Sequence, residues 1–374
     1  MYRTFVSYFS GDDAKRDLVV GALRELGHDV WYDQRDIGKG IGFEEEIQCG
    51  IERAHFLVPV LTESAWTRPW VQQEIGYAIR SGLGVLPVAF GNGKQLQGML
   101  GGIQGVFFAS SDKKEKVLDG LRCVRWQDIL DRFRQHPKSV FRCDSNEDRR
   151  GPDIQESAEH VLRKWQFAKV MQRSPVTSFC LPENWEDQKW KRVVNVPGRQ
   201  NPAGFWPPER ISLEKLITRD GCDLIIDPCY RRDFYRVDLQ KPKLETLLAF
   251  LSRAREDSRL NEKVRVVFKV FDAAESETII GDHWMAHSAA VTRSTTRRET
   301  LSTWHAPTVL HCMQEFQSAF DQLFGEQEQL RRKFSSLTFA VNVIEHALER
   351  LRGKRKVPPR CERCRFQCGR GSRT

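Results

Sequence analysis

Trp70 and Glu74 are the residues of this chain whose types and spacing best suit chemistry. They stand four residues apart in the run Trp70-Val-Gln-Gln-Glu74, so a helix presents both side chains on one face. An indole in that position can pack against an aromatic ring, and a carboxylate beside it can stabilise positive charge that develops in a reaction. A helix glutamate without suitable surroundings is simply a solvated residue, so the elements that position Glu74 decide its role.

Those elements follow from the alternation of short apolar runs and amphipathic stretches in the first 124 residues. Strands are expected where apolar and β-branched residues cluster, and helices where apolar residues recur at helical spacing. The strands are residues 3–9, 29–33, 56–61, 84–90 and 106–109, and the helices are 12–26, 43–54, 69–80 and 115–121. Such alternation predicts an α/β fold with a doubly wound, flavodoxin-like parallel sheet. Residues 7–10, 33–42 and the segment before Glu74 then lie at the carboxyl ends of strands, where ligands bind such sheets.

The rest of the chain predicts a second domain and a tail. Residues 125–175 are rich in helix formers and charges and are read as a helical connector, interrupted at 143–153. The α/β pattern restarts in 176–352, read as a sensor or assembly domain: after a loop-rich start, strands are expected at 223–226 and 264–271, and helices at 244–254, 309–324 and 326–351. The tail, 353–374, is basic and contains cysteine. Because residues 351–374 carry +8 of the net charge of +9, the folded body gives no strong signal for nucleic-acid binding.

The tail also carries Cys361, Cys364 and Cys368. Their spacing suits zinc, but a tetrahedral site needs a fourth ligand and no His or Cys follows. We therefore expect free thiols rather than a metal site, with a distant fourth ligand as the alternative. The basic run Lys354-Arg-Lys356 is read as a solvated segment, with nucleic-acid contact as the alternative.

The location of the chain is expected to be cytoplasmic. The longest apolar runs are far shorter than the ~20 residues that cross a bilayer, and the start of the sequence has no charged and then apolar leader. The cysteines outside the tail are dispersed, which suits a reducing compartment.

Four segments of the first domain resemble, in order and spacing, the motifs of NAD-cleaving TIR (Toll/interleukin-1 receptor) domains. Phe5-Val-Ser-Tyr-Phe-Ser10, followed by Asp12, is similar to the first-strand motif of the family. Asp29-Val-Trp-Tyr-Asp33 resembles its second strand, Ile37–Phe43 its glycine-containing BB loop, and Trp70–Ile75 its W-x-x-x-E motif. The resemblance covers about a third of the chain. Residues 244–324 bear a faint resemblance to a degenerate phospholipase D-like fold without its catalytic residues.

The TIR resemblance implies cleavage of the bond between nicotinamide and ribose in NAD⁺, with Glu74 as the catalytic carboxylate. That bond breaks through an oxocarbenium-like state, as in glycoside hydrolysis, and one carboxylate suffices because nicotinamide leaves without protonation. NAD⁺ is then the substrate, and neither a cofactor nor a metal is expected. Phe9 stands where some relatives have a basic residue. The implied substrate-binding residues are Ser7, Tyr8, Phe9, Ser10, Asp33, Arg35, Ile37, Gly38 and Trp70.

A TIR enzyme domain fused to a larger second domain resembles prokaryotic antiphage effectors. The resemblance implies that the TIR domains form a homo-oligomer, that a trigger at the C-terminal domain, a protein or a nucleic acid, switches NAD⁺ hydrolysis on, and that the outcome is abortive infection. No membrane partner is expected. Two alternatives stay open: a non-catalytic TIR adaptor that acts through TIR–TIR contacts, and a TIR enzyme whose product is a cyclic ADP-ribose-type signal. The trigger, the product and the oligomer size stay undetermined by the sequence.

Overall fold

The fold is described from a computed structural model of the chain. It describes residues 1–32, 43–91, 96, 98–134, 142–144, 150–164, 166–174, 202–227, 237–269, 276–290, 298–328 and 336–351. The chain divides into two compact units. The first comprises Met1–Val140 with Trp304–His311, and the second comprises Phe141–Thr303 with Cys312–Thr374. Each unit is described by itself.

The first unit is built on a parallel sheet in which β1 lies between β2 and β3. The strand order is β2-β1-β3-β5-β6, with β4 pairing the start of β3, and every described pair in this sheet is parallel. The chain therefore moves from β1 to one side for β2 and to the other side for β3, so the strand order reverses between β1 and β3. The strands are β1 (Arg3–Ser7), β2 (Asp29–Tyr32), β3 (Phe56–Leu61), β4 (Gly84–Val85), β5 (Val88–Phe90) and β6 (Val106–Phe108).

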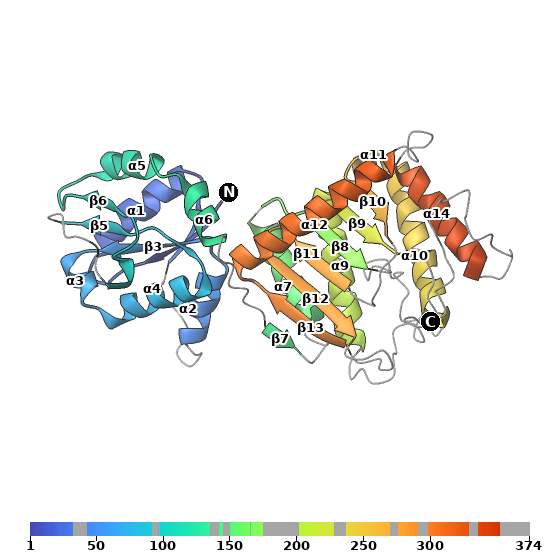
Figure 1. Cartoon of the computed structure of the whole chain (residues 1–374), viewed down its shortest axis with the longest axis horizontal. Coiled ribbons are helices and arrows are strands. Elements are labelled where there is room, and N and C mark those ends of the chain that lie inside the picture. The colour runs from blue at the N-terminus through green and yellow to red at the C-terminus, as the bar shows by residue number, and fades with distance from the viewer. Residues whose placement is uncertain are drawn as a thin grey trace. The chain divides into compact units, whose positions relative to one another are not determined.

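Helices cover both faces of this sheet, as Figure 1 shows. Phe5 points into a cluster with residues of α2 and α4, whereas its neighbour Val6 points into a cluster with residues of α1 and α5. This alternation along one strand is the pleat of a sheet with two buried faces. The doubly wound α/β prediction is thus confirmed. The helices are α1 (Asp13–Glu25), α2 (Phe43–Glu52), α3 (Glu63–Trp66), α4 (Pro69–Ser81), α5 (Lys114–Arg122) and α6 (Trp126–Arg134), with a short 3₁₀ turn at Gly98–Leu100.

The second unit contains a mixed sheet of order β10-β9-β8-β11-β12-β13-β7. The pairs β8–β9 and β9–β10 are parallel, and the remaining pairs are antiparallel. The strands are β7 (Arg142–Asp144), β8 (Val170–Ser174), β9 (Cys222–Ile226), β10 (Val264–Phe268), β11 (Ser276–Ile280), β12 (Trp284–Ala290) and β13 (Arg298–Thr303). The helices are α7 (Arg150–Arg163), α9 (Pro202–Asp220), α10 (Val237–Glu256), α11 (Ser258–Asn261), the part of α12 (Ala306–Glu326) from Cys312 onward, and α14 (Ser336–Leu351).

The structure corrects several element predictions. The segment 125–175, expected to be a helical connector, contains α6 and α7 but also the strands β7 and β8, and β8 lies inside the second sheet. Pairing on both sides of β8 outweighs the helix-forming composition of the segment. The expected strand 84–90 is two short strands, and helix α9 occupies part of the region read as loop-rich. Strands β11 to β13 were not predicted, because their buried hydroxyl side chains hide the apolar signal.

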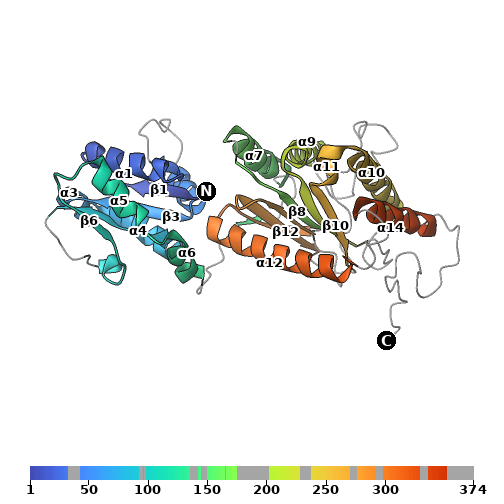
Figure 2. The same ribbon diagram turned by 90° about the horizontal axis from the view of Figure 1, so that it is seen from above.

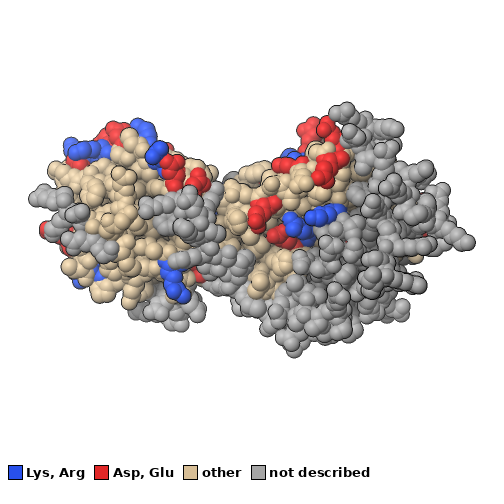
Figure 3. Space-filling model, viewed as in Figure 1, with Lys and Arg blue, Asp and Glu red and all other residues tan. Residues whose placement is uncertain are grey.

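Basic and acidic side chains are interspersed over the described surface of the face drawn in Figure 3. Among the described residues, none of the helices is both long and apolar enough to cross a bilayer. Within the same residues there is no cluster of three or more His, Cys, Asp or Glu side chains suited to a metal ion.

Candidate active site

The candidate site lies at the carboxyl edge of the first sheet, which is the edge where β1, β2 and β3 end. Open α/β sheets bind ligands at this edge, at the point where the strand order reverses, and here that point is between β1 and β3. Ser7 is the last residue of β1, pairs with Pro59 of β3 and is 1% exposed. It shares the face of Phe5, so its side chain lies on the side of α2 and α4. Among the described residues its hydroxyl has no hydrogen-bond partner.

The loops that follow β1 and β3 are tied to each other. The backbone N–H of Asp12 donates to the carbonyl of Phe9 (2.8 Å), which closes the turn that contains Ser10. The Asp12 carboxylate accepts a hydrogen bond from the hydroxyl of Thr62. The same hydroxyl oxygen caps α3 by accepting from the N–H of Ala65 (3.1 Å). This network ties the loop after β1 to the start of α3 at the carboxyl edge of the sheet.

Glu74 lies on the inner face of α4 and is 5% exposed. Its neighbours on that face are Val71, Ile75 and Ala78, which belong to the apolar cluster shared by α2, α4 and the sheet. Helix α4 begins with Pro69 after β3, so Glu74 stands about 7.5 Å along the helix from the carboxyl edge at 1.5 Å per residue. A carboxylate in such a position is costly unless other groups hold it, so the interpretation as a solvated helix residue does not apply.

Trp70 stands one turn before Glu74 and is half-buried. Its ring packs at the border of the same apolar cluster. The indole is therefore a partly buried member of the packing beneath α4, and its contact with a ligand stays a prediction.

Tyr8 lies on the opposite face of the sheet. Its hydroxyl accepts a hydrogen bond from Arg16 (2.7 Å), and the Arg16 guanidinium covers the rings of Tyr8 and Tyr32 at 4.7 and 5.0 Å. The Tyr8 side chain packs against the cluster under α1 and α5. The structure thus separates it from Ser7 and Glu74, which lie on the α2 and α4 side.

Arg68 is a residue of this edge that the sequence patterns did not single out. It is exposed, immediately precedes α4 in the N-cap position, and places its guanidinium 4.0 Å from the centre of the Phe9 ring. A cation and a helix N-terminus at one point form an arrangement that attracts anions. The sequence feature that could have drawn attention to Arg68 is its place in Arg68-Pro69, directly before Trp70. Its contact with Phe9 joins residues 59 positions apart, so only the tertiary structure shows it.

The remaining predicted substrate-binding residues are not all described. Ser10 is half-buried in the turn after β1. Asp33, Arg35, Ile37 and Gly38 lie outside the described residues, so their part in the site stays a prediction.

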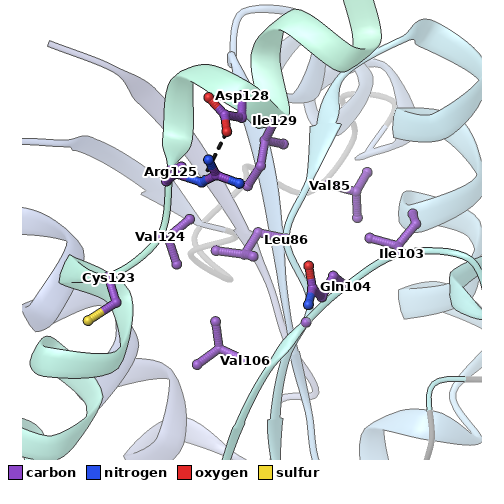
Figure 4. A pocket seen from close by; sticks show the side chains of 11 residues that line it. Val85, Leu86, Ile103, Gln104, Val106, Cys123, Val124, Arg125, Asp128 and Ile129 are labelled. Atoms are coloured by element: carbon purple, nitrogen blue, oxygen red, sulfur yellow. Dashed lines mark ion pairs between the residues drawn. The ribbon is translucent and has the colours of Figure 1, made fainter.

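A separate hollow of about 320 Å³ lies at the opposite, amino edge of the same sheet (Figure 4). The Arg125 guanidinium forms an ion pair with Asp128 (3.1 Å) at its rim, where both side chains are exposed. The hollow is formed by the segments that precede β5 and β6 and by the turn between α5 and α6, so it is not the site of Glu74. Its apolar lining comprises Val85, Leu86, Ile103, Val106, Val124 and Ile129.

Comparison with known proteins places the first unit in a family. Residues 4–122 match the model of the TIR domain family. A 2′ cyclic ADP-D-ribose synthase, BtTIR, of Bacteroides thetaiotaomicron is 32% identical over 76 residues, which is 20% of this chain and 26% of that protein. The chain thus matches about a quarter of that relative. A metazoan TIR-STING receptor from C. gigas, in complex with 2′,3′-cGAMP, aligns over 73% of this chain and 91% of its own at 11% identity, with a TM-score of 0.28.

Proposed function

We propose that this chain, whose residues 4–122 form a TIR domain, cleaves NAD⁺ between nicotinamide and ribose with Glu74 as the catalytic carboxylate. The observation that carries the proposal is the burial of Glu74 on the inner face of α4, close to the point where the strand order reverses. A carboxylate held there can face a ligand at the carboxyl edge. The name of the Bacteroides relative adds support, because its product derives from NAD⁺.

The reaction needs only one charged group of this kind. The bond between C1′ of the ribose and the nicotinamide nitrogen breaks with its electron pair going to nitrogen, so nicotinamide leaves neutral without a proton. Positive charge then develops on C1′ and the ring oxygen, and the Glu74 carboxylate stabilises it. Addition of water to C1′, with release of a proton, gives ADP-ribose. Addition of a hydroxyl group of the same molecule gives a cyclic product and consumes no water.

Arg68 is proposed to hold the pyrophosphate of NAD⁺. Phe9 occupies the place of a basic residue, and the Arg68 guanidinium 4.0 Å above its ring brings a positive charge to the same position. The guanidinium geometry suits phosphate oxygens, and the N-terminus of α4 adds unpaired N–H groups. The aromatic ring orients the cation, and the cation orients the substrate.

The activity is proposed to depend on assembly. TIR–TIR contacts between copies of this chain would complete the site, and the second unit would respond to a trigger during an antiphage response that ends in abortive infection. The basis is the resemblance to prokaryotic effectors that join a TIR domain to a larger second domain.

A chromatographic assay of nicotinamide release tests the proposal. The full chain and the Glu74→Gln variant are incubated with NAD⁺ over a range of protein concentrations and in a pre-assembled, chemically crosslinked form. Release by the full chain and its loss in the variant support the enzyme. No release by the full chain in any form favours a non-catalytic adaptor. The mass of the second product distinguishes ADP-ribose from a cyclic product, which is lighter by one water.

A further inference from the structure

One face of the second sheet carries a row of buried polar side chains that the proposed function does not use. The registers Gln172↔Thr278, Ser276↔Ser288 and Ser288↔Thr300 place these side chains on a single face of β8, β11, β12 and β13. On the same face, β9 and β10 present apolar residues such as Leu224 and Val266. We call the following residues the polar row, and none of them is more than 6% exposed: Gln172, Ser276, Thr278, Ser288, Thr300 and Ser302.

Helices α7 and α9 lie on one side of the second sheet, and α12 lies on the other side (Figure 2). The opposite face carries Arg173 and Arg265, whose guanidinium groups stand 5.9 and 4.7 Å from the rings of Phe316 and Phe320 in α12. Because side chains alternate along a strand, Gln172 then faces away from α12. Contacts of α9 with β8 and of α7 with β12 agree with this assignment.

Both covering helices also bury hydroxyl groups. Asp220, at the end of α9, accepts a hydrogen bond from the N–H of Ala168 just before β8 (2.8 Å), so α9 runs antiparallel to β8. Ser212 is eight residues, or about 12 Å, up the helix from Asp220, which is about the height that Gln172 reaches along β8. Ser212 and Ser157 of α7 are each 5% exposed.

Two polar groups of the polar row take no part in the hydrogen bonds among its described residues. The Ser288 and Thr300 hydroxyls are bonded to each other (2.8 Å), and the Gln172 amide nitrogen donates to Thr278 (3.2 Å). Gln172 Oε1 and the Ser276 hydroxyl have no hydrogen-bond partner among the described residues, although these residues are only 1% and 6% exposed. Buried polar atoms without a partner are uncommon in native proteins and call for an explanation.

The two unpartnered groups are diagonal neighbours across β8 and β11, about 7 to 8 Å apart at their Cα atoms. Gln172 lies at the middle of β8, and Ser276 lies level with Ser174, at the carboxyl ends of the parallel strands β8, β9 and β10, the edge at which open α/β sheets bind ligands. No member of the polar row is cationic, and the nearby Arg173 and Arg265 lie on the other face. The polar row itself therefore offers neutral donors and acceptors, and α7 also buries the Asp153 carboxylate, which is 7% exposed. Hydroxyl groups of a ligand can bond to both kinds of group, which suits a molecule rich in hydroxyl groups.

We propose that the polar row binds the uncharged, ribose-type part of a small ligand between the sheet and helices α7 and α9. Gln172 Oε1 accepts a hydrogen bond from the ligand, and the Ser276 hydroxyl forms a second one. The proposal does not depend on NAD⁺ cleavage, since the site is in the second unit.

Isothermal titration of the full chain with D-ribose, adenosine, guanosine, cytidine and uridine tests this site. The first probe supplies the sugar alone, and the nucleosides supply it with a base, so the arms separate a free sugar from a nucleoside. We expect one-to-one binding of at least one probe. Ser276→Ala should weaken it about fivefold, as loss of one hydrogen bond implies, and combination with Gln172→Leu should weaken it further. Ser252→Ala on α10 is the matched control and should bind as the wild type does.

Thermal unfolding without ligand gives the second readout. Because the Ser276 hydroxyl has no partner among the described residues, Ser276→Ala should leave the Tm unchanged or raise it. Absence of saturable binding of all five probes, or binding that both substitutions leave unchanged, overturns the proposal. A clear fall in Tm for Ser276→Ala overturns it as well, because the hydroxyl then serves the fold.

Discussion

Replacing Glu74 by Gln separates the chemical role of this residue from its structural role. The two side chains have nearly the same shape, so the substitution leaves no cavity beside Val71, Ile75 and Ala78 and removes only the charge. Since removing one preorganised group that stabilises transition-state charge costs about 10² to 10³ in turnover, we expect a loss of that size, which is about 2.7 to 4 kcal/mol in activation free energy. The free energy of unfolding should change by less than about 1 kcal/mol, because packing is kept.

Turnover is measured as nicotinamide release at saturating NAD⁺, and stability by denaturant unfolding of the same preparations. Glu52→Gln is the matched control. Glu52 is also buried, at 6% exposure, but it ends α2 at the amino edge and accepts a hydrogen bond from the Tyr77 hydroxyl (2.6 Å). This control should keep turnover within about threefold and lose about 1 kcal/mol of stability, since its hydrogen bond changes from charged to neutral.

Two results would refute the reasoning. Equal turnover of Glu74→Gln and the wild type would remove Glu74 from the mechanism. An equal loss of turnover in Glu52→Gln would mean that any charge change in the layer of α2 and α4 stops the enzyme, so that the position of Glu74 has no special meaning.

Three further predictions follow from other parts of the chain. Arg68→Ala should raise the KM for NAD⁺ about tenfold with little change in kcat, and the effect should vanish with nicotinamide riboside, which has no pyrophosphate; Arg122→Ala, whose guanidinium pairs with Asp119 on the surface, should change neither constant. Burial lowers the pKa of His28 to about 4 from 6.5, so its contribution to the free energy of unfolding is fully present above pH 6.5 and should fall by about 3 kcal/mol as the pH drops to 4. In unfolding experiments across this pH range, His28→Asn should lack this part of the loss. The same dependence of unfolding free energy on pH in the variant and the wild type would contradict the assignment. Deleting residues 353–374 should leave NAD⁺ turnover of the pre-assembled enzyme unchanged and weaken any nucleic-acid affinity in a salt series, whereas lost turnover would place the tail in the catalytic structure.

The local pattern of the sequence was enough to predict the first sheet. Strand β3 coincides with the apolar run that predicted it, and the helix expected at 69–80 is α4 with one more residue. Each of these elements buries either one continuous apolar run or one apolar face of a helix. Both patterns can be recognised from residues that are close together in the sequence. The second sheet was predicted less well because β11, β12 and β13 bury hydroxyl side chains such as Thr278 and Ser288, which carry no apolar periodicity.

The spacing of Trp70 and Glu74 likewise came from the sequence, since i and i+4 share a helix face whatever surrounds them. Whether that face points to water or to the core depended on the packing of α4 against the sheet, which buries Glu74. The contacts of Asp12 with Thr62 and of Phe9 with Arg68 join segments that are 50 and 59 residues apart. Such pairs exist only once parallel strands align their carboxyl ends, so the tertiary structure alone decided which side chains share the site.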